Sequence, residues 1–267
     1  MTRLILPSHA DHLHFRHRLP DQRLSPWVQC LWSIGSPNLL IDPRTEKLYP
    51  DAGASLSIKL ARHRPIITLC LNRRTLIETL DATTPSLGIR FKAAGIHGLL
   101  GLLPEAFTDT HQGVNDELEA LQLPELMPLV ERLYQVDARQ GLRLLETWLL
   151  DRLTRQPPTH SRIDKVVQAI GALQLPPAQL GATLGFTRRT LERRLKREVG
   201  VSPGQLVAYA RLDRARHGLL ADTRPLADIA LQCGYFDQAH FTHAFQALAY
   251  ETPTAYRKRK LSQIYKA

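Results

Sequence analysis

The sequence predicts an α+β chain: a β-rich, barrel-like N-terminal domain with helical additions, followed by an all-α C-terminal domain. Two patterns support this fold class. Over residues 10–91, short apolar or alternating segments are separated by proline and glycine, which is typical of strands joined by tight turns. After residue 92, apolar residues recur at three- and four-residue steps, which is the period of an α-helix.

These patterns place the individual elements and the domain boundary. Strands are expected at residues 13–16, 27–32, 54–60, 66–69 and 87–91. Helices are expected in the same half of the chain at residues 93–102, 123–134 and 138–153. Residues 154–161 are polar and contain a pair of prolines, which is typical of a linker. We therefore expect one domain over 1–153, a linker over 154–161 and a second domain over 162–260.

Composition excludes several classes of protein. Hydrophobic residues make up 43% of the chain and charged residues 22%, so wholesale disorder is excluded. No stretch approaches the ~18 consecutive apolar residues of a membrane span, and Pro7 and His9 interrupt any signal-peptide core. Three widely spaced cysteines form neither a disulfide framework nor a metal-binding pair. We expect a cytoplasmic protein that makes no membrane contact.

The net charge of +10 lies almost entirely in the C-terminal region. The last 107 residues hold 17 Lys and Arg against 8 Asp and Glu, whereas the first 160 hold 18 against 17. Only eight of the 35 basic residues are Lys, and the planar guanidinium of Arg suits phosphates and guanine edges. Such asymmetry is expected of a domain that meets a polyanion, nucleic acid first and a membrane surface second.

The C-terminal region contains an internal repeat. Residues 180–203 and 229–253 match at an offset of 49 residues up to a glycine–aromatic pair and of 50 residues after it. The second copy therefore has one extra residue in its turn. Each copy is expected to be a helix, a turn at Gly185 or Gly234, and a second helix capped by Thr187 or Asp237. Both copies are candidate helix-turn-helix units.

The segment between the copies has the pattern of one long helix. It begins at Ser202-Pro203, ends near Leu220 and carries an apolar stripe of Leu206, Tyr209, Leu212, Ala215 and Leu219. A helix of this length spans roughly 27 Å. Successive major grooves on one face of DNA lie about 34 Å apart. The connector is therefore of the right order to hold two recognition helices over adjacent grooves, with some bending of the DNA or tilting of the units.

Several motifs of this region resemble the AraC/XylS family of bacterial transcription regulators. They are Leu191-Glu192-Arg193-Arg194-Leu195, Gly200-Val201-Ser202-Pro203, Arg211-Leu212 with Ala215, Ile229-Ala230 with Gly234-Tyr235, and Phe241 through Pro253-Thr254-Ala255-Tyr256-Arg257. In the N-terminal part, Tyr49-Pro50-Asp51-Ala52-Gly53 and Leu87-Gly88-Ile89-Arg90-Phe91 are similar to a divergent sensor domain of some relatives. The resemblance implies a double helix-turn-helix DNA-binding domain, which usually activates transcription near RNA polymerase.

The resemblance also assigns roles to individual residues. It implies that the base-reading residues are Arg189, Glu192 and Arg193 in the first unit, and Gln238, Ala239, His240 and His243 in the second. Arg can chelate guanine, Glu can accept a hydrogen bond from cytosine, and Ala offers a methyl contact to thymine. Arg188, Arg194 and Arg197 are expected to contact phosphates, which sets the register without reading the sequence.

The second unit departs from the family pattern. Relatives commonly have Arg at the position of His243, Lys at Gln246, Gly at Tyr250 and Ala at Gly181. The second recognition helix consequently has no Lys or Arg between Asp237 and Leu248. We hypothesise that the first unit supplies most of the phosphate affinity, while the second adds readout with pH sensitivity through its histidines. A bulky residue such as Tyr250 is strained at positive φ, which puts the family's turn geometry there in question.

Other motifs support alternatives only weakly. His9, His12, His14 and His17 form no ligand set with Cys or acidic residues, so no metal and no cofactor is expected. Asp109, His111 and Asp116 have no catalytic spacing, so the chain is not expected to be an enzyme. Trp27 and Trp32 fit a domain core better than a ligand cavity. The alternatives are an enzyme with a DNA-localising tail and an architectural DNA-binding protein with little sequence preference.

We therefore expect a sequence-specific transcription regulator, more an activator than a repressor, that binds double-stranded DNA. Its N-terminal domain is expected to respond to a small-molecule effector, with no binding residue assigned, or to pair two copies of the chain. Pairing would raise the effective concentration of the DNA-binding domains on adjacent half-sites. The helix at 138–153 can supply the pairing surface or close the core of its own domain.

Overall fold

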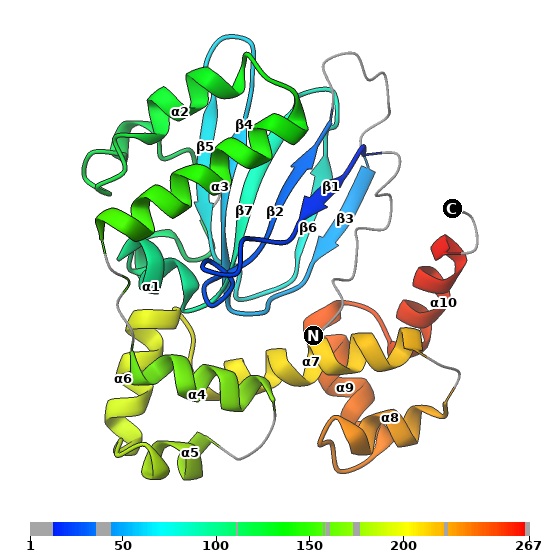
Figure 1. Cartoon of the computed structure of the whole chain (residues 1–267). Coiled ribbons are helices and arrows are strands. Elements are labelled where there is room, and N and C mark those ends of the chain that lie inside the picture. The colour runs from blue at the N-terminus through cyan, green and yellow to red at the C-terminus, as the bar shows by residue number, and fades with distance from the viewer. Residues whose placement is uncertain are drawn as a thin grey trace.

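The structure is a computed structural model that describes residues 13–35, 44–110, 112–156, 158, 161–172, 177–221 and 224–264. The N-terminal half is a sheet with helices packed on one face (Figure 1). Helices of the C-terminal half lie together beyond one end of this sheet (Figure 1). The chain thus has the predicted α+β architecture. Three parts of the expected linker, residues 157, 159 and 160, lie outside the described residues.

Five antiparallel strands form the main sheet. They are β1 (Arg16–Arg18), β2 (Val28–Ile34), β4 (Gly53–Lys59), β5 (Ile66–Cys70) and β7 (Ser86–Ala93), in the order β1-β2-β7-β4-β5. Four of the expected strands are confirmed within a few residues. The first is displaced: it was expected at 13–16 and the structure has it at Arg16–Arg18, because His14 has a φ of 48°, which is incompatible with a strand.

Two further strands were not expected from the sequence. β3 (Arg44–Leu48) and β6 (Leu76–Leu80) pair with each other in a two-stranded ribbon. Most of β6 is exposed, so it carries little of the apolar signal that marks a strand in a sequence. The ribbon does not hydrogen-bond to the main sheet within the described residues, so the barrel-like arrangement is an open sheet and a ribbon.

The two faces of the main sheet differ in character. Side chains on one face form the core, with Leu56, Ile89 and Phe91 fully buried. Alternate positions on the same strands place Ser55 and Arg90 on the opposite face, which is more polar. One face therefore binds the helices, and the other faces a cavity.

Three helices cover the apolar side of the sheet: α1 (Gly95–Leu100), α2 (Leu126–Leu133) and α3 (Ala138–Arg155) (Figure 1). α3 begins with a capping box formed by Asp137 and Gln140, and Gly141 in its first turn packs closely against the sheet. A Cβ there would lie 2.6 Å from the Leu87 side chain. The predicted apolar stripe of α3 is buried in this core, so it closes its own domain and is not a surface for pairing.

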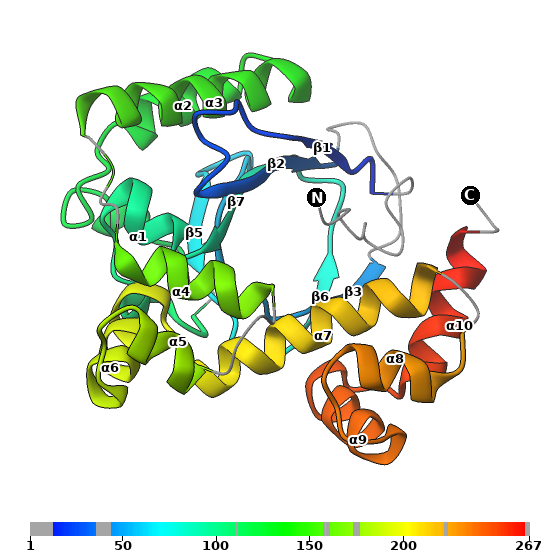
Figure 2. The same ribbon diagram turned by 60° about the horizontal axis from the view of Figure 1, so that its bottom comes forward.

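The C-terminal region is all helical among its described residues. Its helices are α4 (Arg162–Gly171), α5 (Pro177–Thr183), α6 (Arg188–Val199), α7 (Pro203–Ala221), α8 (Leu226–Gln232), α9 (Gln238–Ala249) and α10 (Pro253–Ile264). The long connecting helix is confirmed as α7, and all five residues of its predicted stripe are buried. Figure 2 shows α7 running from the group of α4, α5 and α6 at one end to α8, α9 and α10 at the other.

Candidate nucleic-acid interface

The first helix-turn-helix unit consists of α5 and α6. The turn between them contains Gly185 at a φ of 74°, which glycine adopts without strain. Thr187 then caps α6, because its hydroxyl accepts a hydrogen bond from the backbone N–H of Thr190. Leu191 and Leu195 are buried on the inner face of α6. The predicted turn and cap are thus confirmed, and the outer face of the helix is left to solvent.

The outer face of α6 carries most of the residues expected to contact DNA. Arg189, Glu192, Arg193 and Arg197 are exposed. Arg188 is exposed as well, and its Nε donates to Glu192 Oε1 at 3.1 Å. An exposed pair of this kind is weak, so both side chains are available to a ligand.

Arg194 occupies a different environment from the other arginines of α6. Its Nε donates to Glu198 Oε1 at 2.7 Å, and its Nη2 donates to Ser161 Oγ at 3.0 Å. Its guanidinium also lies 5.4 Å from the centre of the Phe186 ring. These contacts join α6 to the start of α4 and to the turn. Arg194 therefore has a structural role in addition to the phosphate contact expected of it.

The second unit consists of α8 and α9 and repeats the same plan. Gly234 in its turn has a φ of 78°, and Asp237 Oδ1 accepts a hydrogen bond from the backbone N–H of His240 at 2.7 Å. Phe241 and Phe245 are fully buried on the inner face of α9. The four residues expected to read bases are all exposed: Gln238, Ala239, His240 and His243. The predicted cap is confirmed here too.

Tyr250 occupies the position at the end of α9 where glycine is common in the family. It adopts a φ of 55° and a ψ of 30°, and its N–H donates to the carbonyl of Gln246. The left-handed turn is thus kept in spite of the bulky side chain. Lys47 of β3 supports this turn, because its ammonium donates to the carbonyls of Ala249 at 3.2 Å and of Tyr250 at 3.1 Å. A cation at the C-terminal end of a helix is favourable.

The N-terminal domain contacts the C-terminal ends of both recognition helices. At the end of α6, Gly200 has a φ of 83°, and a Cβ there would lie 2.9 Å from the Pro104 side chain of the N-terminal domain. Near the end of α9, the Thr75 hydroxyl donates to the carbonyl of Leu248. Between them, the Tyr209 hydroxyl of α7 donates to the carbonyl of Arg73 at 2.7 Å. At the N-terminal ends of α6 and α9, Arg188, Arg189 and residues 238–240 are exposed.

A polar cluster strengthens the contact with the second unit. Tyr49 donates from its hydroxyl to Glu251 Oε1 at 2.9 Å and accepts from Arg259 Nη2 at 2.8 Å. The Arg216 guanidinium lies 4.1 Å from the centre of the Tyr49 ring. Burial opposes ionisation of Glu251, but the hydrogen bonds from Arg259 and Tyr49 outweigh it and lower the pKa of that carboxyl.

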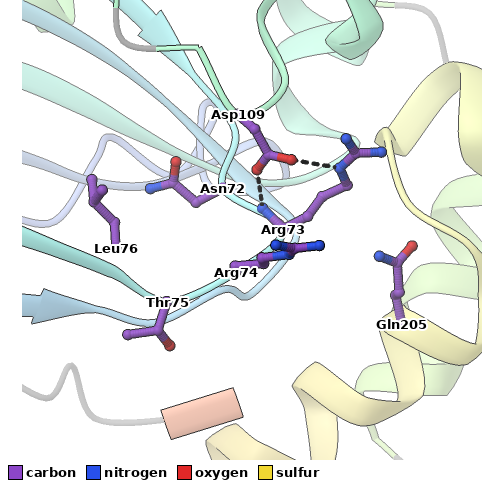
Figure 3. A pocket seen from close by; sticks show the side chains of 7 residues that line it. All are labelled: Asn72, Arg73, Arg74, Thr75, Leu76, Asp109 and Gln205. Atoms are coloured by element: carbon purple, nitrogen blue, oxygen red, sulfur yellow. Dashed lines mark hydrogen bonds and ion pairs between the residues drawn. The ribbon is translucent and has the colours of Figure 1, made fainter. Parts of the chain in front are cut away.

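A pocket lies where the loop between β5 and β6 meets the start of α7. It has a volume of about 480 Å³ and includes Arg73, Asp109 and Gln205 (Figure 3). Figure 3 shows Asp109 accepting hydrogen bonds from the backbone N–H and the Nε of Arg73, both at 2.8 Å. Partial burial opposes ionisation of Asp109, but these hydrogen bonds lower its pKa. The carboxylate thus holds the loop that contacts α7.

A cavity of about 1730 Å³ lies between the polar face of the main sheet, the β3–β6 ribbon and α7. Trp32 lies on its wall, over Gly88 of the neighbouring strand, where a Cβ would be 2.4 Å from the indole. Trp27, in contrast, is 6% exposed and belongs to the core. The expectation that both tryptophans are core residues therefore holds for Trp27 and is wrong for Trp32, because only Trp32 is on the cavity face.

Comparison with known proteins identifies the fold of the C-terminal region. Residues 180–259 match the model of a helix-turn-helix domain, and residues 16–112 match a domain of unknown function. The chain is 30% identical over 142 residues to the transcriptional activator RhaS of Klebsiella pneumoniae. The aligned region is 52% of this chain and 44% of that protein. These matches show a helix-turn-helix domain in the C-terminal region and a similarity to a transcriptional activator.

One further curated relative and two solved structures are also similar to this chain. The chain is 24% identical to the probable transcriptional regulator LumQ of Photobacterium leiognathi, over 61% of this chain and 60% of that one. A transcriptional regulator from Chromobacterium violaceum with an AraC-type DNA-binding domain is 28% identical, with a TM-score of 0.34 over 36% of this chain and 88% of that chain. Apo ToxT from Vibrio cholerae is 15% identical, with a TM-score of 0.44 over 91% of this chain and 99% of that chain. The chain spans about half the length of the first curated relatives that it matches.

The weaker candidate sites are not assembled among the described residues. Asp109 pairs with Arg73 and Asp116 pairs with Arg64, while His111 lies outside the described residues. His9 and His12 also lie outside them. Within the part of the chain that the structure describes, no three His, Cys, Asp or Glu residues are grouped as a metal would require. No described helix is long and apolar enough to cross a membrane.

Two parts of the site were missed by sequence reasoning. These are the contacts of Lys47, Tyr49 and Thr75 with the second unit and the cavity behind them. The only signal was the short motif at residues 49–53, which the family resemblance assigned to a sensor domain without any role for Tyr49.

Proposed function

We propose that this chain is a sequence-specific DNA-binding transcription regulator that activates transcription by RNA polymerase. The observation that supports it best is the pair of helix-turn-helix units joined by α7, which has 19 residues and is therefore about 29 Å long. Both recognition helices expose their N-terminal halves and are held at their C-terminal ends by the same domain. This arrangement suits two contacts on one face of a duplex.

Within this function, we infer that Arg189, Glu192 and Arg193 read bases at one half-site, and Gln238, Ala239, His240 and His243 at the other. Arg188 and Arg197 supply phosphate contacts, and Arg194 supplies one while holding the turn of the first unit. The exposure of these side chains supports the assignment. The first unit then contributes most of the affinity, because the second recognition helix has no Lys or Arg.

A binding selection tests the function directly. Duplexes enriched from a random pool by the full chain are expected to share a motif with two half-sites about one helical turn apart. At fixed salt, the chain is expected to prefer this duplex over bulk DNA by at least about a thousandfold. Arg193→Ala should weaken binding, whereas Arg143→Ala, an exposed arginine on α3, should not. Equal binding to all duplexes would instead identify an architectural DNA-binding protein.

Activation requires a separate measurement. In transcription assays with purified RNA polymerase, a promoter that carries the selected motif should yield more transcript when the chain is added. Arg193→Ala is expected to remove this increase and Arg143→Ala to keep it. A decrease in transcript would identify a repressor and contradict the proposed sign of regulation.

We propose that the cavity between the sheet, the ribbon and α7 receives the effector. It is bounded by both domains, so a ligand there would bias the contacts that hold α9. Small molecules that raise the melting temperature of the chain are expected to lose this effect in Ser57→Trp, which places an indole in the cavity from β4. Retention of the effect in this variant would place the ligand elsewhere.

Pairing of two copies on adjacent sites is a further part of the proposal. The buried stripe of α3 cannot supply the contact, so any pairing uses another surface of the N-terminal domain. Light scattering at micromolar concentration, with and without the selected duplex, tests it. A monomeric mass in both measurements would contradict pairing.

A further inference from the structure

The two helix-turn-helix units differ by one residue, and the structure shows which residue it is. In the first unit, Gly185 and Phe186 are followed directly by the cap Thr187. In the second unit, Gly234 and Tyr235 are followed by Phe236 before the cap Asp237. Phe236 is therefore the residue that has no counterpart in the first unit.

The two flanking aromatic residues, Phe186 and Tyr235, each contact an arginine. The guanidinium of Arg194 lies 5.4 Å from the centre of the Phe186 ring, and that of Arg211 lies 5.4 Å from the centre of the Tyr235 ring. Phe186 thus contacts an arginine of its own recognition helix, whereas Tyr235, which is only 6% exposed, contacts an arginine of α7. Phe236 takes no part in this packing.

The extra side chain points into solvent. Phe236 is 86% exposed, and the next most exposed large apolar side chains of the described residues are Leu19 at 67% and Leu231 at 63%. The N-terminal domain covers the other end of α9, through Lys47 and Thr75, and leaves this end open. A single exposed apolar residue is ordinary on a protein surface, so exposure alone does not indicate a binding role. The position of Phe236 relative to the recognition helix does.

That position is the N-terminal end of the recognition helix, the end that contacts base edges in a helix-turn-helix complex. The exposed residues that follow are Gln238, Ala239 and His240, and α9 contains no Lys or Arg. The second unit therefore presents amide, imidazole and apolar groups to a duplex. The apolar feature of the major groove is the C5-methyl group of thymine, which Phe and Ala side chains contact.

We propose that Phe236 is a specificity-determining DNA contact, which packs against thymine methyl groups at the second half-site. This inference rests on the proposed DNA-binding function and deepens it. It predicts that the second half-site is selected for thymine where Phe236 meets it. The two units then differ in chemistry, with charge at the first half-site and apolar contact at the second.

Removing single methyl groups from the DNA tests this contact. The full chain is titrated with the selected duplex and with one whose second half-site has deoxyuridine in place of thymidine, a change that deletes only the C5-methyl. The unsubstituted chain is expected to bind the deoxyuridine duplex about five- to tenfold more weakly. Phe236→Ala should bind the thymidine duplex about tenfold more weakly than the unsubstituted chain does, and it should lose most of the discrimination between the two duplexes, keeping only the part due to Ala239.

Two controls separate this contact from other causes. Leu231→Ala, which removes another exposed apolar side chain of the same unit, should keep both the affinity and the discrimination. The slope of log Kd against log salt concentration should be the same for Phe236→Ala and the unsubstituted chain, because an apolar contact releases no counterions. A changed slope would overturn the proposal.

Other outcomes also decide against the inference. If Phe236→Ala keeps the discrimination between thymidine and deoxyuridine, Phe236 is not the methyl contact. If it binds DNA normally but activates transcription less, Phe236 faces a protein. In both cases sequence-specific binding that Arg193→Ala weakens would leave the proposed function intact. Failure of the proposed function would appear differently, as the absence of any preferred duplex for the unsubstituted chain.

Discussion

At the end of the first recognition helix, a glycine is pressed against apolar side chains of the N-terminal domain, whereas the end of the second is held by hydrogen bonds. Gly200 meets Pro104 and Leu71, and the core of the first unit is continuous with that of the sheet. The second unit has a core of its own, and Lys47 and Thr75 attach it through backbone carbonyls. The first attachment is mainly apolar packing and the second is mainly polar.

This difference suggests how a signal in the cavity would reach DNA. Packed apolar interfaces tolerate little displacement, whereas a few hydrogen bonds can exchange with water at small net cost. The second unit is therefore the part that a ligand would release or reorient first. Its recognition helix is also the neutral one, so a change there would alter sequence preference more than overall affinity.

The largest effect is expected at the apolar attachment. Gly200→Val should destabilise the chain by about 3 kcal/mol or more, because a β-branched residue is strained at a φ of 83° and its Cβ would meet Pro104. Urea denaturation gives the free energy of unfolding. Gly204→Val, at a helical position with open space around it, is the matched control and should cost about 1 kcal/mol or less. Equal effects at the two positions would show that the first unit does not depend on this contact.

The two recognition helices should differ in how they depend on salt. Arg193→Ala is expected to weaken binding to the selected duplex about tenfold, and Arg197→Ala to reduce the slope of log Kd against log salt by about one. His243→Ala should relax preference at the second half-site and leave the slope unchanged. Anisotropy titrations at several salt concentrations measure both quantities. If the arginine and histidine variants change the slope equally, the first unit does not supply most of the phosphate contacts, contrary to the proposal.

A smaller effect is expected at the polar attachment. Lys47→Met removes the ammonium that donates to the carbonyls of Ala249 and Tyr250, so it should destabilise the second unit by about 1 kcal/mol. Hydrogen exchange should become faster in α9 and stay unchanged in α6. The exposed Lys258 on α10 supplies the control Lys258→Met. Faster exchange in both recognition helices would show that the two attachments act as one.

The smallest effect is expected from Glu251. Because its pKa is lowered in the folded chain, its ion pairs stabilise the fold fully above its ordinary value of 4.5, and this contribution is lost as the pH falls through the lowered pKa. Glu251→Gln should therefore be less stable than the unsubstituted chain at pH 6, by less than about 1 kcal/mol, and the gap should narrow as the pH approaches 3. A gap that widens on acidification would contradict the lowered pKa.

Local patterns explain why the helical half was predictable. The caps Thr187 and Asp237 bond to the backbone three residues ahead, and the buried stripe of α7 repeats at helical spacing. Such signals lie within a few residues of each other, so a sequence displays them directly. The strands at β2, β4, β5 and β7 carried enough apolar residues to be found in the same way.

The β3–β6 ribbon carried no such signal. Both strands are short, β6 is largely exposed, and they pair only with each other across a gap of about thirty residues. The location of Trp32 on the wall of the cavity could not be predicted from the sequence for a related reason. A tryptophan in a strand has the same local pattern whether its face meets helices or a cavity, and only the other layers distinguish the two.

The sequence alone determined the two units, their caps, the length of the connecting helix and the contrast between a charged and a neutral recognition helix. Tertiary structure alone decided that Lys47 holds α9 from 202 residues away, that Arg194 is tied to the start of α4, and that a cavity separates the sheet from α7. The reason is the range of the interactions. Caps and helical faces depend on neighbours in the chain, whereas domain contacts depend on which surfaces remain after each domain has buried its own apolar face.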